Sequence, residues 1–466
     1  MTHIVIRHAE IAGTPGLDLR LRDGRIAAIG PSLLLDGADE VIDADGAAVI
    51  PGLHDHHVHL HAAAAAAASA RCGPPYVDDP QALARELAAA PGDEHGWVRG
   101  VGYIETVAGD LDAAAIDVLH AERPVRIQHR SGALWMLNTA ALTVIRAGGA
   151  PHPGVERDPA GNPTGRIWRA DGWLRERLPP VSPPPLNDLA ATLTASGITG
   201  VTDATPDLPD DTLDALVGAS VGGAFPQRLY LLGVPLAHSG SALPGEIGVG
   251  PYKLVLADSA LPSLDDLVER IRRAHRAGRA VAVHCVSREA LVLLLAAFDI
   301  TGHRPGDRVE HAALVPADLI TDIRRHGLRV VTQPGFLRHR GDYYLAHVEP
   351  ADRPDLYRCR TLADAGVPVA LSSDAPYGPL DPWLVISAAV HRTTASGVTM
   401  SAPECLTPMQ ALTGYLAAPD DPGGPPRRIR VGSSADLVLL RAPLGDVLRA
   451  PSADAVRTTF IAGRPM

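Results

Sequence analysis

The segment Pro51-Gly52-Leu53-His54-Asp55-His56-His57-Val58-His59-Leu60 joins a short apolar run to a cluster of histidines. Residues 53–58 have the length and pattern of a buried strand. Because side chains alternate along a strand, His57 and His59 lie on one face of it. The chain contains 20 histidines. A His-x-His pair is therefore expected about once by chance, and it carries weight only if other ligand-type side chains meet it.

Seven further short apolar runs follow this segment, and the eight runs together predict the fold. From the fourth run onward they alternate with helical stretches such as residues 264–277. Strand, helix and strand in succession is typical of βαβ units, and eight units close an α/β fold of the TIM-like (β/α)8 barrel type. The predicted strands are residues 53–58, 198–204, 228–234, 252–257, 280–285, 308–312, 328–333 and 367–372. A doubly wound open sheet is the alternative, which the lack of a Gly-x-Gly-x-x-Gly motif after the first strand weakens.

The two ends of the chain are predicted to form a second, smaller domain. Residues 1–52 contain short alternating strands with a tight turn at Asp23-Gly24, and residues 427–466 repeat this style, including an expected strand at 428–431. We expect the two ends to pair into a small β-sandwich beside a barrel that spans residues 53–426. The long gap between the first and second barrel strands predicts an insertion at about residues 62–196.

Composition limits the partners. The net charge is −11 and no Lys/Arg run occurs, so nucleic acid and anionic membranes are unfavourable partners, and a small-molecule substrate is expected. The sequence shows neither a membrane span nor a signal peptide, which predicts a cytoplasmic protein. Its four cysteines form no Cys-x-x-Cys pair, so a metal would have to be held by His and carboxylate side chains. A homodimer stays open as the assembly.

Six side chains with metal-binding chemistry lie inside or at the carboxyl ends of predicted barrel strands. They are His57, His59, Lys253, His284, His311 and Asp374. In a barrel this edge collects catalytic residues, so the six are expected to converge on one point. Neutral imidazoles bind Zn²⁺ and similar cations, and a carboxylate accepts the proton of metal-bound water.

Lys253 is the only lysine among the 42 basic residues of the chain. An arginine guanidinium stays protonated in proteins, whereas a buried lysine amine can become neutral. A neutral amine can add CO₂ to form a carbamate, and this anion would bridge two cations. Two other interpretations stay open: a chance survivor of mutational bias, and a plain cation at the mouth of the barrel.

These motifs resemble the amidohydrolase superfamily, and within it the branch of N-substituted formamide deformylase (amidohydrolase family 3). The resemblance covers nearly the whole chain. It rests on DGRI at 23–26, the histidine segment at 51–60, GITGVTDA at 197–204, RVEHA at 308–312 and GSSADLV at 432–438. Branch-level motifs are WVRGVG at 97–102, NTAAL at 138–142, GNPTG at 161–165 and VVTQP at 330–334. The resemblance implies a metal-dependent hydrolase, with the six residues at its ligand positions.

The mechanism that we predict cleaves a carbon–nitrogen bond of an amide, N-formyl, N-acyl or cyclic amide substrate. A metal-bound hydroxide, available because the cation lowers the pKa of water to about 7, attacks the carbonyl. Asp374 carries the proton to the leaving nitrogen. His57 and His59 hold one cation, His284 and His311 hold a second, and the Lys253 carbamate bridges them. We expect two Zn²⁺, with CO₂ as the source of the carbamate.

Four further residues are candidates for substrate binding: Trp97, Tyr103, Arg169 and Gln333. The alternatives are that the two aromatic residues belong to the core and that Gln333 caps a strand end. Arg169 replaces a glutamate of the branch, and Ser287-Arg288 replaces its Gly-Asp. Such added arginines leave an anionic substrate open.

Three other functions stay in competition. A one-metal deaminase needs an acid three residues after His284, where this chain has Ser287. An esterase, lactonase or phosphotriesterase would use the same metal centre. A scaffold without catalysis is disfavoured because all six ligand types are present.

Overall fold

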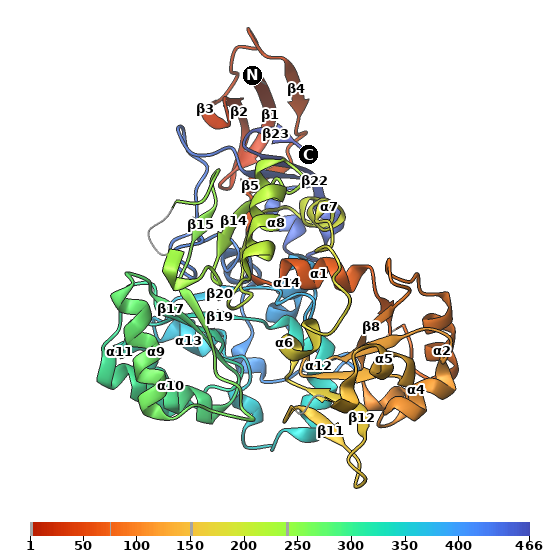
Figure 1. The fold of residues 1–466 in the computed structure, drawn as a ribbon. Helices are drawn as coiled ribbons and strands as arrows, with labels where there is room; N and C mark the ends of the chain where they lie inside the picture. Colours follow the sequence, from red (N-terminus) through yellow and green to blue (C-terminus); the bar gives the residue numbers. More distant parts are fainter. Residues whose placement is uncertain (1–2, 75, 150–151, 239–241) are drawn as a thin grey trace. The chain divides into compact units, whose positions relative to one another are not determined.

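The computed structural model describes residues 3–74, 76–149, 152–238 and 242–466 (Figure 1). The chain divides into two compact units. The first contains Met1–Leu60 and Leu186–Met466, and the second contains His61–Pro185. The second unit falls within the stretch in which the sequence predicts an insertion, apart from its first residue.

Both ends of the chain join one eight-stranded sheet in the first unit. Its strands are β1 (His3–Ile11), β2 (Thr14–Arg22), β3 (Arg25–Gly30), β4 (Glu40–Asp43), β5 (Ala48–Pro51), β21 (Leu437–Leu440), β22 (Val456–Ile461) and β23 (Arg464–Pro465). The order is β23-β22-β21-β5-β1-β2-β3, and β4 pairs with β1. In Figure 1 the red N-terminal and blue C-terminal strands lie side by side. The two-layered sandwich stays a prediction.

Local chemistry explains the β2–β3 hairpin and one wrong prediction. Asp23 and Gly24 have positive φ angles of 51° and 75°, which the tight turn between two antiparallel strands needs. Residues 428–431 form no strand, contrary to the prediction. The chain pairs with β3 a few residues later, at an isolated bridge between Ser434 and Arg25.

Two parallel sheets form the body of the first unit. The first sheet has the order β15-β14-β13-β6 and the second has the order β16-β17-β18-β19-β20. Each of the eight predicted barrel strands overlaps one of these strands, while β15 was not predicted. Their bounds are β6 (Leu53–Val58), β13 (Ile198–Asp203), β14 (Arg228–Leu231), β15 (Gly248–Val249), β16 (Tyr252–Val255), β17 (Val281–Cys285), β18 (Arg308–His311), β19 (Arg329–Thr332) and β20 (Val369–Leu371).

Main-chain hydrogen bonds link the ends of these two sheets. Lys253 N donates to the Leu232 carbonyl at 3.3 Å, which joins β16 to the chain just beyond β14. Asp374 N donates to the His57 carbonyl at 2.8 Å, which joins the chain after β20 to β6. The arrangement is that of a TIM-barrel-like α/β fold, and it brings the carboxyl ends of β6 and β20 together. Full closure of the barrel stays a prediction.

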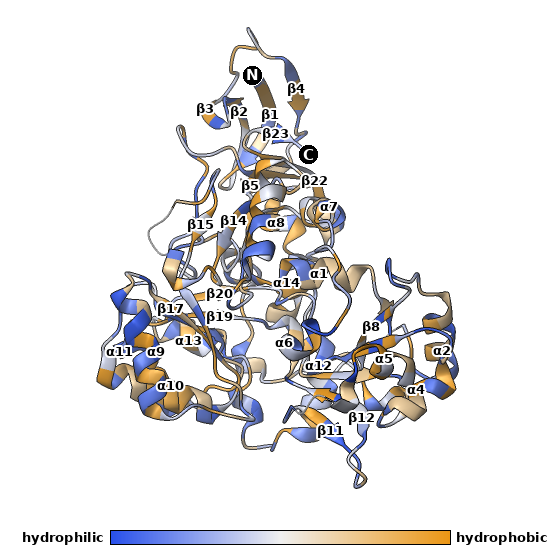
Figure 2. Ribbon diagram, viewed as in Figure 1, coloured by the Kyte–Doolittle hydropathy of each residue, from blue (hydrophilic) through white to orange (hydrophobic). Residues whose placement is uncertain are grey.

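Segments between the strands form helices because their sequences carry capping residues and an apolar stripe. In α9 the N-cap Ser263 accepts from Asp266 N, acidic residues occupy the first turn and arginines the last. Figure 2 shows hydrophilic and hydrophobic residues together on α9 and α10. The helices of this unit are α7 (Asn187–Ala195), α8 (Asp210–Val221), α9 (Leu264–Arg276), α10 (Arg288–Thr301), α11 (Ile320–Arg325), α12 (Gly335–His347), α13 (Arg360–Asp364), α14 (Pro382–His391), α15 (Pro408–Thr413) and α16 (Leu444–Val447).

The second unit is built on its own six-stranded sheet, in the order β11-β12-β10-β9-β8-β7. Its strands are β7 (Ala70–Arg71), β8 (Val98–Tyr103), β9 (Val125–His129), β10 (Leu134–Leu137), β11 (Val155–Arg157) and β12 (Pro163–Trp168). Its helices are α2 (Pro80–Ala89), α3 (Glu105–Ala108), α4 (Ala113–Leu119), α5 (Thr139–Val144) and α6 (Asp171–Arg175), and α1 (Leu60–Ala67) leads into it. Among the described residues, no helix is both long and apolar enough to cross a bilayer.

Candidate metal centre

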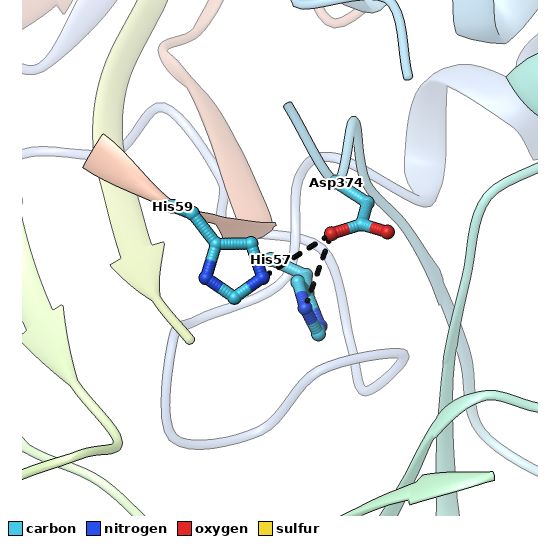
Figure 3. Close-up of side chains that lie close together, drawn as sticks. All are labelled: His57, His59 and Asp374. Atoms are coloured by element: carbon cyan, nitrogen blue, oxygen red, sulfur yellow. Dashed lines mark ion pairs between the residues drawn. The ribbon is translucent and has the colours of Figure 1, made fainter. Parts of the chain in front are cut away.

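Three side chains from two strand ends form a group that could hold a metal ion (Figure 3). His57 lies in β6, His59 follows β6 directly, and Asp374 follows β20. Asp374 Oδ1 lies 3.5 Å from His57 Nε2 and 3.4 Å from His59 Nε2. One ligand atom from each residue lies within 4.8 Å of the others. The pleat of β6 and the hydrogen bonds that join β6 to the chain after β20 place these atoms together.

The other ring nitrogen of each of these histidines is occupied by the protein. His57 Nδ1 bonds to Glu310 Oε2, and His59 Nδ1 lies 3.2 Å from Thr205 Oγ1. Both Nε2 atoms therefore face Asp374 Oδ1, and that of His57 also lies 3.4 Å from Lys253 Nζ. Fixing one ring nitrogen in this way is how proteins orient imidazole ligands.

Burial favours the neutral form of two imidazoles at this site, those of His57 and His311. His57 and His311 are buried, and this burial lowers the pKa of each ring well below its ordinary value. The nearby Lys253 amine lowers the pKa of both rings further. A neutral imidazole has the lone pair that a metal ion requires.

His311 and His284 lie beside this group. The ring of His311, at the end of β18, has its centroid 4.8 Å from that of His57 and 4.4 Å from that of His284 in β17. His311 Nδ1 is 3.7 Å from Asp374 Oδ2. The structure thus brings all four predicted histidines and the predicted aspartate to one place.

Lys253 reaches the same place from β16. Its Nζ lies 3.4 Å from His57 Nε2, and the side chain is buried. This burial lowers the pKa of Lys253 to about 8, although the carboxylates of Glu310 and Asp374 act in the opposite direction. The amine therefore loses its proton far more readily than an exposed lysine would.

Backbone strain marks the two strand ends that carry His311 and Asp374. Their φ angles are 70° and 51°, in the left-handed region. Such a conformation costs a non-glycine residue about 1–3 kcal/mol, and it is found most often at functional sites. Here hydrogen bonds hold it: Thr332 Oγ1 donates to the His311 carbonyl, and Asp374 N donates to the His57 carbonyl, each at 2.8 Å.

The donor set fits a divalent cation. Among the described residues, Asp374 Oδ1 is buried without a hydrogen-bond partner, although it lies between the two Nε2 atoms. A buried carboxylate oxygen without a hydrogen-bond donor is unfavourable, and a bound cation would compensate its charge. Two imidazole nitrogens and a carboxylate oxygen are ligands typical of Zn²⁺ and similar ions.

Gln333, the fourth candidate for substrate binding, lies just after β19 and is buried. Its Oε1 lies 2.9 Å from His311 Nδ1, and its Nε2 donates to Ser372 Oγ at 2.9 Å. The amide therefore supports the His311 ring. Contact with a substrate stays a prediction.

Trp97, Tyr103 and Arg169 belong to the second unit. Trp97 packs in an apolar cluster with Trp135, and Tyr103 is buried with its hydroxyl donating to the Gly109 carbonyl at 2.5 Å. Arg169 is exposed. Their proposed contacts with substrate stay predictions.

Two carboxylates that hold His57 are not among the predicted site residues. Glu310 stands inside the quoted RVEHA motif, next to His311, yet only the histidine was assigned a role. Asp55 is the second: its Oδ1 accepts from His57 N at 3.2 Å and from Ser373 N at 3.1 Å, which ties β6 to the chain after β20. The sequence does hold a signal for Asp55: it stands two residues before His57, so both side chains lie on the same face of the strand.

Comparison with known proteins finds relatives across nearly the whole chain. A model of the amidohydrolase family matches residues 40–466. The N-substituted formamide deformylase of Arthrobacter pascens is 25% identical over 491 residues, covering 90% of this chain and 88% of that protein. An uncharacterized metal-dependent hydrolase from Pyrococcus horikoshii OT3 has a TM-score of 0.75 at 19% identity, with 100% of this chain and 99% of that chain covered. Its counterpart from Pyrococcus furiosus has a TM-score of 0.71 at 20% identity, with 94% and 98% covered.

Proposed function

The chain belongs to the amidohydrolase family, and from that premise we propose that it hydrolyses an amide bond of a small molecule at the site formed by His57, His59 and Asp374. The family makes it a metal-dependent hydrolase that acts on carbon–nitrogen bonds. The proposed substrates are N-formyl, N-acyl or cyclic amides. Similarity to a formamide deformylase supports the N-formyl class first.

The unpartnered Asp374 Oδ1 between two imidazole Nε2 atoms is the observation that carries the proposal. His57 and His59 would hold one cation, and His284 and His311 a second, with Zn²⁺ the metal that suits them best. A divalent cation bound there would lower the pKa of water to about 7 and polarise the substrate carbonyl.

Asp374 is the proposed proton carrier. Its carboxylate would take a proton from the attacking water and release it to the leaving nitrogen, so that the amine departs uncharged. Its two oxygens face different imidazoles, with Oδ1 near His57 and His59 and Oδ2 near His311. A carboxylate placed in this way is within reach of both sides of the reaction centre.

Lys253 is the proposed source of an anionic bridge. CO₂ would add to the neutral Nζ: a nitrogen–carbon bond forms, a carbon–oxygen π bond becomes a carboxylate, and the amine loses one proton. The lowered pKa and the position of Nζ, 3.4 Å from His57 Nε2, support this reaction. An arginine at this position would stay protonated.

A deaminase is less well supported. The position where it would need an acid holds Ser287, and this serine is the N-cap of α10. Its hydroxyl accepts from Ala290 N at 3.2 Å and donates to Asp258 at 2.6 Å. Ser287 is thus engaged in holding a helix end.

The test combines metal analysis with a substrate screen on the purified full-length chain. Two metal equivalents and amine release from N-formyl, N-acyl or cyclic amides are the expected result. One equivalent would reduce the proposal to a single-metal site. A chain that binds no divalent metal, or that hydrolyses esters or lactones but no amide, would overturn it.

A further inference from the structure

A charged pair of side chains in the interior of the first unit contacts the metal centre from behind. Arg308 and Glu310 both lie in β18, and His57 lies in β6, which is not a neighbouring strand. Arg308 Nε donates to Glu310 Oε1, and Glu310 Oε2 bonds to His57 Nδ1. All three side chains have an exposed fraction of zero. They form an Arg308–Glu310–His57 chain with no access to solvent.

Stability alone does not explain such a chain. Removing a carboxylate and a guanidinium from water is unfavourable, so a buried ion pair is weak evidence for stabilisation. Arg308 is also imperfectly satisfied: Nη2 donates to the His56 carbonyl at 3.4 Å, and among the described residues Nη1 has no partner. What the Arg308–Glu310 pair does provide is a fixed contact with Nδ1 of His57.

That contact selects one tautomer of His57. An ionised carboxylate only accepts hydrogen bonds, so the nitrogen that faces Glu310 must carry the proton. The proton on Nδ1 leaves a lone pair on Nε2, which lies 3.5 Å from Asp374 Oδ1 and 3.4 Å from Lys253 Nζ. A carboxylate behind an imidazole also makes it a stronger ligand.

Neutral groups hold the other two rings. His59 Nδ1 faces the hydroxyl of Thr205, which can donate or accept, and His311 Nδ1 faces the amide of Gln333, which can present either end. Among these three rings, only His57 has a carboxylate within hydrogen-bond distance of Nδ1, because Asp374 Oδ2 lies 3.7 Å from His311 Nδ1. This difference singles out His57 as the ring whose tautomer is fixed most firmly.

We propose that Glu310, held in place by Arg308, is a positioning residue that locks His57 in the Nδ1-protonated tautomer and thereby keeps Nε2 available to a metal ion. The inference rests on the proposed function, in which His57 is a ligand. It deepens that function by assigning a role to two residues that do not touch the metal.

The first test needs no substitution in the pair. Ring ¹⁵N–¹H NMR spectra of the metal-free, histidine-labelled full-length chain report the tautomer of each imidazole, and the loss of one signal set in His57→Gln assigns His57. The expected result is a proton on Nδ1. A proton on Nε2, or a mixture of tautomers, would overturn the proposal whether or not the protein binds metal.

The second test compares Glu310→Gln with a matched control. Asp307→Asn also neutralises a buried carboxylate that contacts a histidine, because Asp307, just before β18, has its Oδ1 3.1 Å from His275 Nε2, outside the metal centre. Chelator competition with Zn²⁺ should give a metal affinity about 10–100-fold weaker in Glu310→Gln and unchanged in Asp307→Asn. Equal losses in both variants, or none in Glu310→Gln, would overturn the positioning role. A wild-type chain that takes up no metal would instead contradict the proposed function.

Discussion

Lys253 shows how much a single residue type reveals. A sequence whose other basic residues are all arginines retains its one lysine at a buried position against His57. Burial lowers the pKa of this amine to about 8, so near neutral pH a usable fraction is uncharged. That property separates Lys253 from an arginine, which would present a permanent charge there.

The substitution Lys253→Arg should therefore abolish carbamate formation. We expect the variant to lose at least one metal equivalent and most of kcat/KM, because a fixed cation would stand where an anionic bridge is proposed. Metal analysis and steady-state kinetics measure both effects. Arg279→Lys, at a buried basic residue outside the site, should keep its metal. Wild-type metal load and turnover in Lys253→Arg would rule out the carbamate.

Asp374 is the residue on which the chemistry depends. The substitution Asp374→Asn keeps an oxygen ligand but removes the proton acceptor, so we expect kcat to fall roughly 10²–10⁴-fold while metal remains bound. Stopped or continuous amine-release assays give kcat, and metal analysis gives occupancy. An unchanged kcat would reject the proton-carrier role. Loss of the metal would show that Asp374 acts mainly as a ligand.

At the scale of elements, helix positions follow from caps and apolar spacing. The predicted helix at 264–277 is found as α9, and its buried residues Leu267, Ile271 and Ala274 recur every three or four positions. The eight predicted barrel strands are likewise found, because period-two and continuous apolar patterns are local properties. The strand predicted at residues 428–431 is absent because an alternating apolar segment needs a partner strand to pair with. The bridge to β3 forms only after these residues, at Ser434.

The N-cap of α9 offers a test at this scale. Ser263 Oγ accepts from Asp266 N at 3.2 Å. We expect Ser263→Ala to lower the free energy of unfolding by about 0.5–2 kcal/mol, because one backbone donor at the helix start loses its partner. Urea unfolding followed by circular dichroism measures the change. Ser263→Asp, which keeps an acceptor, should stay close to wild type, and equal losses in both variants would contradict the capping role.

For the whole molecule, buried histidines predict how stability depends on pH. Burial lowers the pKa of His54, His56, His57 and His311 well below the ordinary 6.5. Below that value the unfolded chain binds protons that the folded chain does not, so folding loses free energy as the pH falls. Asp55 acts in the opposite direction, since burial raises its pKa to about 6, but four groups outweigh one.

The metal-free protein should therefore unfold at lower urea concentration at pH 5.5 than at pH 7.5. The metal-free state is required because bound metal adds its own stabilisation and its own proton competition. The measurement is the urea concentration at the midpoint of unfolding at each of the two pH values. Equal midpoints, or a higher one at pH 5.5, would contradict the net effect expected from the lowered pKa values of these histidines.

Local sequence patterns are enough to predict the repeating strands and helices, the His-x-His face of β6, and the residue types that gather at the strand ends. These follow from local periodicity and from the rule that carboxyl ends of parallel strands share one edge. The folded chain is needed to see that Glu310 holds His57, that Gln333 holds His311, and that the Lys253 amine is buried against an imidazole. These contacts join strands that are distant in the chain, and which ring nitrogen is left free depends on the partner across the interior, which no local pattern encodes.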